Sequence, residues 1–275
     1  MTAICPICPR HCSIEEGKLG FCRARKNEGG TVICDNYGRL TSMALDPIEK
    51  KPLRRFHPGS MILSVGSYGC SLACPFCQNS EISMAGPDDA RTEFVSPAEL
   101  AEYADEQREN GNLGVAYTYN EPLVGYEYVM DTAKLVHGYD MKNVLVTNGY
   151  ICREPLEELL PFIDAMNIDL KGYNREYYSW LEGSLDTVKD TIQTAARACH
   201  VEVTTLIVPG RNDKDTEMQR LARWLASVDD RIPLHVTRFF PRYKMADAAE
   251  TPVETVHHLA NIASSELQYV YTGNC

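Results

Sequence analysis

The sequence lacks any long apolar run, and it has few positive charges. No stretch approaches the roughly 20 apolar residues that a membrane-spanning helix needs, and residues 1–6 show no basic segment leading into an apolar one, as a signal peptide would. We therefore expect a cytoplasmic protein with no membrane partner. The 27 lysines and arginines are outnumbered by 38 aspartates and glutamates, which gives a net charge of −11. This balance disfavours a nucleic-acid partner, because phosphate backbones attract basic surfaces.

Cysteine, by contrast, is abundant, with eleven among 275 residues. In a secreted protein this number would indicate disulfides, but most of these cysteines form two tight groups, which favours metal binding in a reducing compartment. The loop cysteines are Cys70, Cys74 and Cys77, and the N-terminal cysteines are Cys5, Cys8, Cys12 and Cys22. Cys34, Cys152 and Cys199 have no partner at motif spacing and are expected to be small buried residues, and Cys275 is expected in a mobile terminus.

Two zones follow one another along the chain. Residues 1–55 are rich in cysteine, glycine and charge, which predicts a small domain held by metal rather than by a core. Residues 56–275 alternate strand-like and helix-like segments, with strands expected at 61–66, 114–119, 142–147, 163–170, 201–208 and 234–240. This alternation predicts right-handed βαβ units and a parallel sheet. Six units suit a partial (β/α)6 barrel of the TIM type better than a complete barrel of eight.

Two segments have the residues of a helix start. Ser96 and Glu99 form a capping box around a proline, and residues 251–254 repeat that pattern near the end of the chain.

The loop cysteines have a spacing that leaves a metal cluster incomplete. A cubane [4Fe–4S] cluster normally takes four cysteine ligands. Three thiolates this close hold three corners and leave one iron open for chemistry, just as catalytic zinc sites keep one open position. The alternative interpretation is three buried or zinc-bound cysteines.

Polar residues follow the expected strands at their carboxyl ends, where ligands collect in parallel α/β folds. They are Asn120 and Glu121 after the second strand, Thr147 and Asn148 after the third, Asp169 and Lys171 after the fourth, and Arg238 on the sixth. Their concentration at one end predicts a single site in the mouth of the barrel.

These residues, together with several longer runs, resemble the radical S-adenosylmethionine (SAM) family related to pyruvate formate-lyase activating enzyme, and within it the AmmeMemoRadiSam system radical SAM enzymes. The runs are residues 5–12, 20–22, 46–53, 57–60, 70–79, 117–122, 146–149, 169–172 and 208–213. The resemblance implies that SAM chelates the open iron. An electron from a flavodoxin or ferredoxin type of donor then cleaves SAM to methionine and a 5′-deoxyadenosyl radical, which abstracts hydrogen from a protein, such as a glycine in a partner, or from a small molecule.

The resemblance also implies a role for each candidate residue. The loop cysteines ligate the cluster and Phe76 packs near the adenine. Asn120 and Glu121 stand where relatives carry a Gly-Gly-Glu motif for the SAM amino group, with Tyr119 and Asn120 in place of the glycines. Thr147 and Asn148 line the same corner, Asp169 and Lys171 contact the methionyl part, and Arg238 substitutes for an arginine that binds the SAM carboxylate.

The N-terminal cysteines fit either a structural zinc or a second [4Fe–4S] cluster, because four thiolates satisfy both. His11 is a substitute ligand for this set. A different class of function is an iron–sulfur electron carrier or zinc-binding adaptor without SAM chemistry. That function would explain the cysteines but not Glu121, Asp169 and Lys171.

Overall fold

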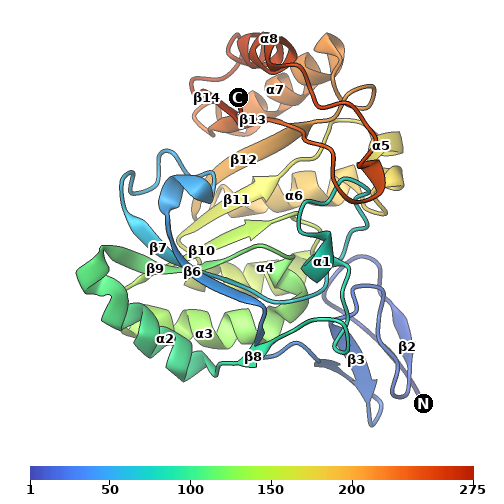
Figure 1. The fold of residues 1–275 in the computed structure, drawn as a ribbon, viewed down its shortest axis with the longest axis vertical. Coiled ribbons are helices and arrows are strands. Elements are labelled where there is room, and N and C mark those ends of the chain that lie inside the picture. The colour runs from blue at the N-terminus through green and yellow to red at the C-terminus, as the bar shows by residue number, and fades with distance from the viewer.

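The structure is a computed structural model that describes residues 1–275. At its centre is a curved sheet of eight strands in the order β14-β13-β12-β11-β10-β9-β7-β6 (Figure 1). Its strands are β6 (Ser42–Pro47), β7 (Met61–Gly66), β9 (Asn112–Tyr117), β10 (Lys142–Thr147), β11 (Ala165–Asp169), β12 (His200–Ile207), β13 (Leu234–Arg238) and β14 (Val270–Gly273). Neighbouring strands are parallel except for β6, which runs antiparallel to β7 at one edge. The predicted partial barrel is confirmed.

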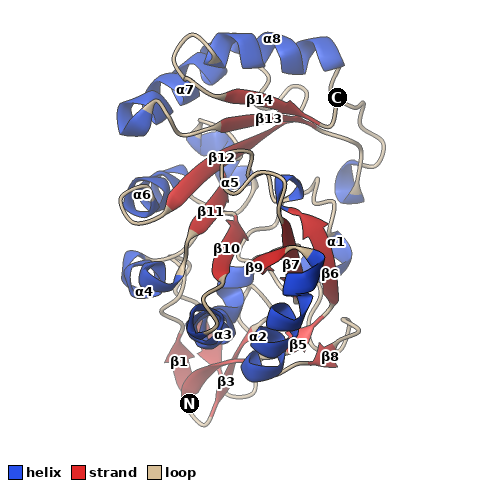
Figure 2. Ribbon diagram, turned by 90° about the vertical axis from the view of Figure 1, so that its left-hand side faces the viewer, coloured by secondary structure: helices blue, strands red, loops and turns tan.

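Helices cover the outer face of the sheet, as the side view shows (Figure 2). They are α2 (Pro97–Glu106), α3 (Tyr126–Gly138), α4 (Arg153–Leu159), α6 (Leu185–Ala195), α7 (Asp215–Asp229) and α8 (Val253–Ala263). Two short helices, α1 (Ser80–Ser83) and α5 (Arg175–Trp180), lie instead at the carboxyl end of the sheet, in the segments that follow β7 and β11 (Figure 1). In α7, for example, Met218, Leu221, Ala222 and Leu225 are buried at helical spacing, so one face of the helix meets the core. None of the helices combines the length and the apolar character that crossing a membrane requires.

The two predicted helix starts had different outcomes. Ser96 and Glu99 form the capping box at the start of α2. The prediction for Thr251 was wrong: α8 begins at Val253 without a side-chain cap. The Thr251 hydroxyl donates instead to the carbonyl of Ile207, 2.6 Å away, and so ties this segment to the end of β12.

The N-terminal segment forms small two-stranded sheets at one end of the molecule, opposite α7 and α8 (Figures 1 and 2). They pair β1 (Thr2–Ile4) with β2 (Ser13–Glu15), β3 (Arg25–Glu28) with β4 (Thr31–Cys34), and β5 (Arg39–Leu40) with β8 (Glu93–Phe94). The predicted first domain, residues 1–55, is not separate throughout, because its last part from Ser42 onward joins the barrel.

Residues 48–55 cover the barrel at the amino ends of the strands, with some of their side chains turned inward. Ile48 and Leu53 are fully buried there. The backbone amides of Arg54 and Arg55 donate to the buried carboxylate of Glu202 at 3.0 and 2.7 Å. This end of the barrel is therefore covered by the chain itself, and the functional residues lie at the other end.

Candidate functional site

The loop cysteines follow β7 directly, at the carboxyl end of the sheet. Cys74 is buried, and Cys70 and Cys77 are partly buried. The amide of Cys77 donates to the carbonyl of Cys74 at 3.2 Å, which makes the turn between them tight. The amide of Leu72 donates to the Cys70 sulfur at 3.4 Å. The loop therefore fixes three sulfur-bearing residues in a short, hydrogen-bonded segment.

Burial and charge set the protonation of these thiols. Burial raises the pKa of Cys70 well above its ordinary value, and it raises the pKa of Cys74 to about 11 although Lys171 opposes this. The Lys171 ammonium itself pairs with Asp169, Nζ to Oδ2, at 2.6 Å. Burial lowers the pKa of Lys171, but Asp169 and the Cys74 thiolate outweigh burial, so the net shift is upward. A permanent cation thus lies beside the loop cysteines, where it would stabilise thiolates.

Glu121 lies at the centre of the barrel mouth. Its carboxylate is 3% exposed and accepts hydrogen bonds from the amide of Leu123 at 3.0 Å, from the Thr147 hydroxyl at 2.7 Å and from the amide of Asn148 at 2.8 Å. Burial raises the pKa of Glu121 to about 7, against the effect of these bonds. All three donors are neutral, so the buried carboxylate is oriented by the chain but has no cation from the chain to balance it.

Two asparagines connect this carboxylate to the cysteine loop. Asn120 accepts from the amide of Ser67 at 2.9 Å and donates to the carbonyl of Gly69 at 3.0 Å. Asn148 donates to the Ser71 hydroxyl at 3.2 Å and lies 3.6 Å from the Cys70 sulfur. The structure thus brings these two predicted residues to the site, and the amide of Asn120 is used to hold the loop.

Tyr119 occupies the first of the two expected glycine positions, and it does so at the backbone angle that glycine favours. Its φ is 70°, in the left-handed region that costs a non-glycine residue energy. Its hydroxyl donates to the Asp46 carboxylate at 2.8 Å. The side chain is thereby anchored away from Glu121.

Phe76 packs into an aromatic group behind the loop. Its ring stacks on that of Tyr177 with centroids 6.4 Å apart, and it also meets Trp180 and Phe239. Tyr177 comes from α5, which our sequence reasoning did not assign to the site, although the aromatic run at 177–180 was a signal for it. The Tyr177 hydroxyl is buried without a hydrogen-bond partner. The same apolar cluster contains Cys74, so this hydroxyl lies within the surroundings of the loop cysteines.

Arg238 is engaged elsewhere. Its guanidinium donates to the carbonyl of Thr251 at 2.7 Å and pairs with Glu250 at 2.5 Å. It also lies over the ring of Phe240. The segment before α8, rather than the group around Glu121, therefore holds this arginine.

The N-terminal cysteines line a small hollow, partly open to solvent, whose lining also includes Ser71, Leu123 and Tyr150 from the barrel mouth. The structure thus places this second cysteine set beside the first. The remaining cysteines are half-buried at positions 34, 152 and 199, and Cys275 is exposed.

The residues of the barrel mouth fit a cluster with one open iron and SAM. No three histidine, cysteine, aspartate or glutamate side chains converge on one metal ion, so the fit is judged from chemistry and charge. The loop supplies three thiols beside the cation Lys171. Glu121 supplies a buried carboxylate that needs a positive partner, which the SAM ammonium provides through a charge-assisted hydrogen bond.

Comparison with known proteins supports the same assignment. The sequence model of the radical SAM superfamily matches residues 64–225. An uncharacterized protein of Methanocaldococcus jannaschii is 42% identical over 273 residues, which are 98% of this chain and 80% of that protein. The 4-hydroxyphenylacetate decarboxylase activating enzyme of Clostridium scatologenes is 24% identical over 116 residues, which are 41% of this chain and 37% of that enzyme.

A solved structure supports the fold. A domain of the pyruvate-formate lyase-activating enzyme from Bacteroides vulgatus superposes with a TM-score of 0.51 at 19% identity, covering 58% of this chain and 99% of that domain.

Proposed function

The chain belongs to the radical SAM superfamily, and from that premise we propose that the loop cysteines hold the [4Fe–4S] cluster at which this enzyme cleaves SAM reductively. Bound together, the reduced cluster and SAM supply methionine and a 5′-deoxyadenosyl radical for hydrogen abstraction. The hard chemistry belongs to these cofactors, while the protein binds, orients and excludes water.

The observation that carries this proposal is the state of Glu121. A buried carboxylate held by three neutral donors, 2.7 to 3.0 Å away, is expensive unless a cation joins it. The SAM amino group is such a cation, and Glu121 lies one strand from the cysteine loop. We assign Glu121 to the SAM ammonium, with Thr147 and Asn148 as the residues that orient its carboxylate.

Other residues of the mouth take supporting roles in this proposal. Lys171, paired with Asp169, balances the negative charge of the loop thiolates and faces the methionyl part of SAM. Phe76 provides the apolar wall for the adenine. Asn120 holds the loop backbone rather than the cofactor, since its side-chain amide is already bonded at both ends.

The substrate is proposed only by class. The radical would abstract hydrogen from a protein, with a glycine Cα–H as one target, or from a small molecule. The likeness to the 4-hydroxyphenylacetate decarboxylase activating enzyme supports the protein branch. The reductant is proposed to be a flavodoxin or ferredoxin type of donor.

An electron carrier or zinc-binding adaptor remains the alternative, and SAM turnover separates it from the enzyme. We expect anaerobically reconstituted protein with dithionite to form 5′-deoxyadenosine, Cys74→Ala to lose that activity, and Cys199→Ala, a cysteine far from the motif, to keep it. Turnover that survives in Cys74→Ala would refute the assignment of the cluster.

A further inference from the structure

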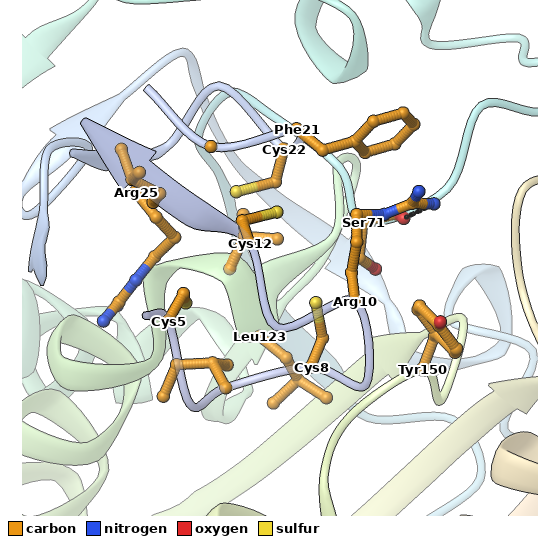
Figure 3. A pocket seen from close by; sticks show the side chains of 14 residues that line it. Cys5, Cys8, Arg10, Cys12, Phe21, Cys22, Arg25, Ser71, Leu123 and Tyr150 are labelled. Atoms are coloured by element: carbon orange, nitrogen blue, oxygen red, sulfur yellow. Dashed lines mark hydrogen bonds between the residues drawn. The ribbon is translucent and has the colours of Figure 1, made fainter. Parts of the chain in front are cut away.

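The N-terminal cysteines surround one hollow. In Figure 3 the sulfur atoms of Cys8, Cys12 and Cys22 face a common space, with Arg25 on one side and Arg10 and Tyr150 on the other. Cys5 belongs to the same lining. All four N-terminal cysteines therefore line the same hollow.

Local pairing explains how the chain brings these cysteines together. In the β1–β2 ribbon Ile4 lies opposite Ser13, so Cys5 and Cys12 follow at adjacent ends. The amide of Cys5 donates to the carbonyl of Cys12 at 3.0 Å. The ring of His11 is turned away, with one nitrogen 3.4 Å from the Cys5 carbonyl and the other 3.9 Å from the Cys152 sulfur. The four cysteines, without the histidine, are therefore the candidate ligands of this hollow.

Two arginines, Arg10 and Arg25, line the hollow. Arg25 is 3% exposed, and its terminal nitrogens pair with Glu127. Arg10 lies over the ring of Phe21, 3.5 Å from its centroid. The Nε of each arginine is buried and has no hydrogen-bond partner. In the lining of a thiolate-rich site, such an N–H would be able to donate to the thiolates or to the sulfides of a cluster.

The hollow adjoins the loop cysteines. The amide of Cys70 donates to the carbonyl of Cys22 at 3.2 Å. Ser71, the next residue, lines the hollow, and its hydroxyl accepts from Asn148, which also reaches the Cys70 sulfur. Cys8 packs against the apolar cluster that includes Cys74. The N-terminal cysteines and the loop cysteines are thus in direct backbone contact.

From this arrangement we propose that the N-terminal cysteines hold a second [4Fe–4S] cluster that passes single electrons to the cluster of the loop cysteines. A reduced flavodoxin or ferredoxin gives one electron to the second cluster, which goes from the 2+ to the 1+ state. That electron then moves to the first cluster, and the second returns to 2+. Zinc has no redox chemistry, so a zinc ion at this site would make no use of its position beside the loop cysteines.

The first test is metal content after anaerobic reconstitution with iron and sulfide. We expect roughly eight irons per chain in the wild type and in the control Cys199→Ala, and roughly four in Cys8→Ala and in Cys12→Ser. Because Cys12 is partly exposed, its serine variant keeps the fold most reliably, and retained SAM binding confirms that. A wild type with about four irons, with or without one zinc, would overturn the second cluster.

The proposed electron transfer from the second cluster to the first, here called the relay, is tested by comparing two electron donors. The ratio of flavodoxin-driven to dithionite-driven formation of 5′-deoxyadenosine should fall at least about tenfold in Cys12→Ser relative to Cys199→Ala. An unchanged ratio would overturn the relay. The relay rests on the proposed function, and different experimental results would reject each of them. Four irons with full SAM cleavage would reject the second cluster alone, whereas eight irons with no SAM cleavage would reject the proposed function, and the relay with it.

Discussion

The backbone amide of Cys70 donates a hydrogen bond to the carbonyl oxygen of Cys22, 3.2 Å away. These residues belong to different cysteine sets and are far apart in sequence, so this bond joins the N-terminal segment to the loop of the barrel. Gly69 makes the approach possible. Its φ is 90°, and a Cβ at this position would lie 2.4 Å from the Cys22 oxygen.

Gly69→Ala should therefore open this junction. The backbone strain of an alanine in the left-handed region costs about 1–2 kcal/mol, and the contact with a backbone oxygen adds about 1–3 kcal/mol. Gly17→Ala is the matched control, since Gly17 also has a positive φ, 72°, but nothing lies within 4 Å of the added Cβ. In anaerobic urea unfolding, the free energy of unfolding should fall more in Gly69→Ala than in Gly17→Ala. Equal losses in the two variants would mean that the junction is not tight.

Glu121→Gln should weaken SAM binding while the iron content stays the same. The amide keeps the size of the side chain but removes the charge that faces the SAM ammonium, and bonds to charged groups contribute about 1.5–3 kcal/mol. We expect the Kd of SAM for reconstituted protein, measured by equilibrium dialysis, to rise at least about tenfold. The exposed Glu109→Gln serves as control. Unchanged affinity in Glu121→Gln would remove the assigned role.

The free energy of unfolding should depend on pH because of Glu202, which lies at the amino ends of the barrel strands. Burial alone would raise its pKa, but hydrogen bonds from His200, His235 and two backbone amides lower it from 4.5 to about 2. Because the pKa is lower in the folded state, this stability is fully present above pH 4.5 and is lost as the pH falls from 4.5 to 2. Its size is about 3 kcal/mol.

The check is urea unfolding of the wild type and Glu202→Gln at pH 7 and pH 3. The variant should be less stable than the wild type by about 3 kcal/mol at pH 7. Between pH 7 and pH 3 its free energy of unfolding should fall less than that of the wild type. A variant as stable as the wild type at pH 7 would show that the buried carboxylate contributes nothing. Glu109→Gln, again, should follow the wild type.

Features set by neighbouring residues were predictable from the sequence. β7 and β10 have the predicted bounds, because alternating β-branched and apolar residues specify a strand locally. The Ser96 capping box is complete within four residues. The cysteine loop and the polar residues at the strand ends were found for the same reason, since the order of parallel strands brings their carboxyl ends to one edge.

Features that depend on distant partners were not predictable. The edge strands β6 and β14 each pair with the sheet on one side only, and β6 ends at Pro47, which an edge tolerates. Their pairing depends on the sheet that they join. The stacking of Tyr177 on Phe76 and the contact of Cys22 with Cys70 arise only after the barrel has closed. Thr251 is a further example. The local pattern predicted that its hydroxyl caps a helix, but the hydroxyl donates to the distant carbonyl of Ile207 instead.

The most direct test of the central claim is the identity and ratio of the products of SAM. Anaerobically reconstituted protein, reduced with dithionite and given SAM, should form 5′-deoxyadenosine and methionine in equal amounts, because both come from one cleaved bond. The absence of both products, with the loop-cysteine cluster reduced and SAM bound, would contradict the account.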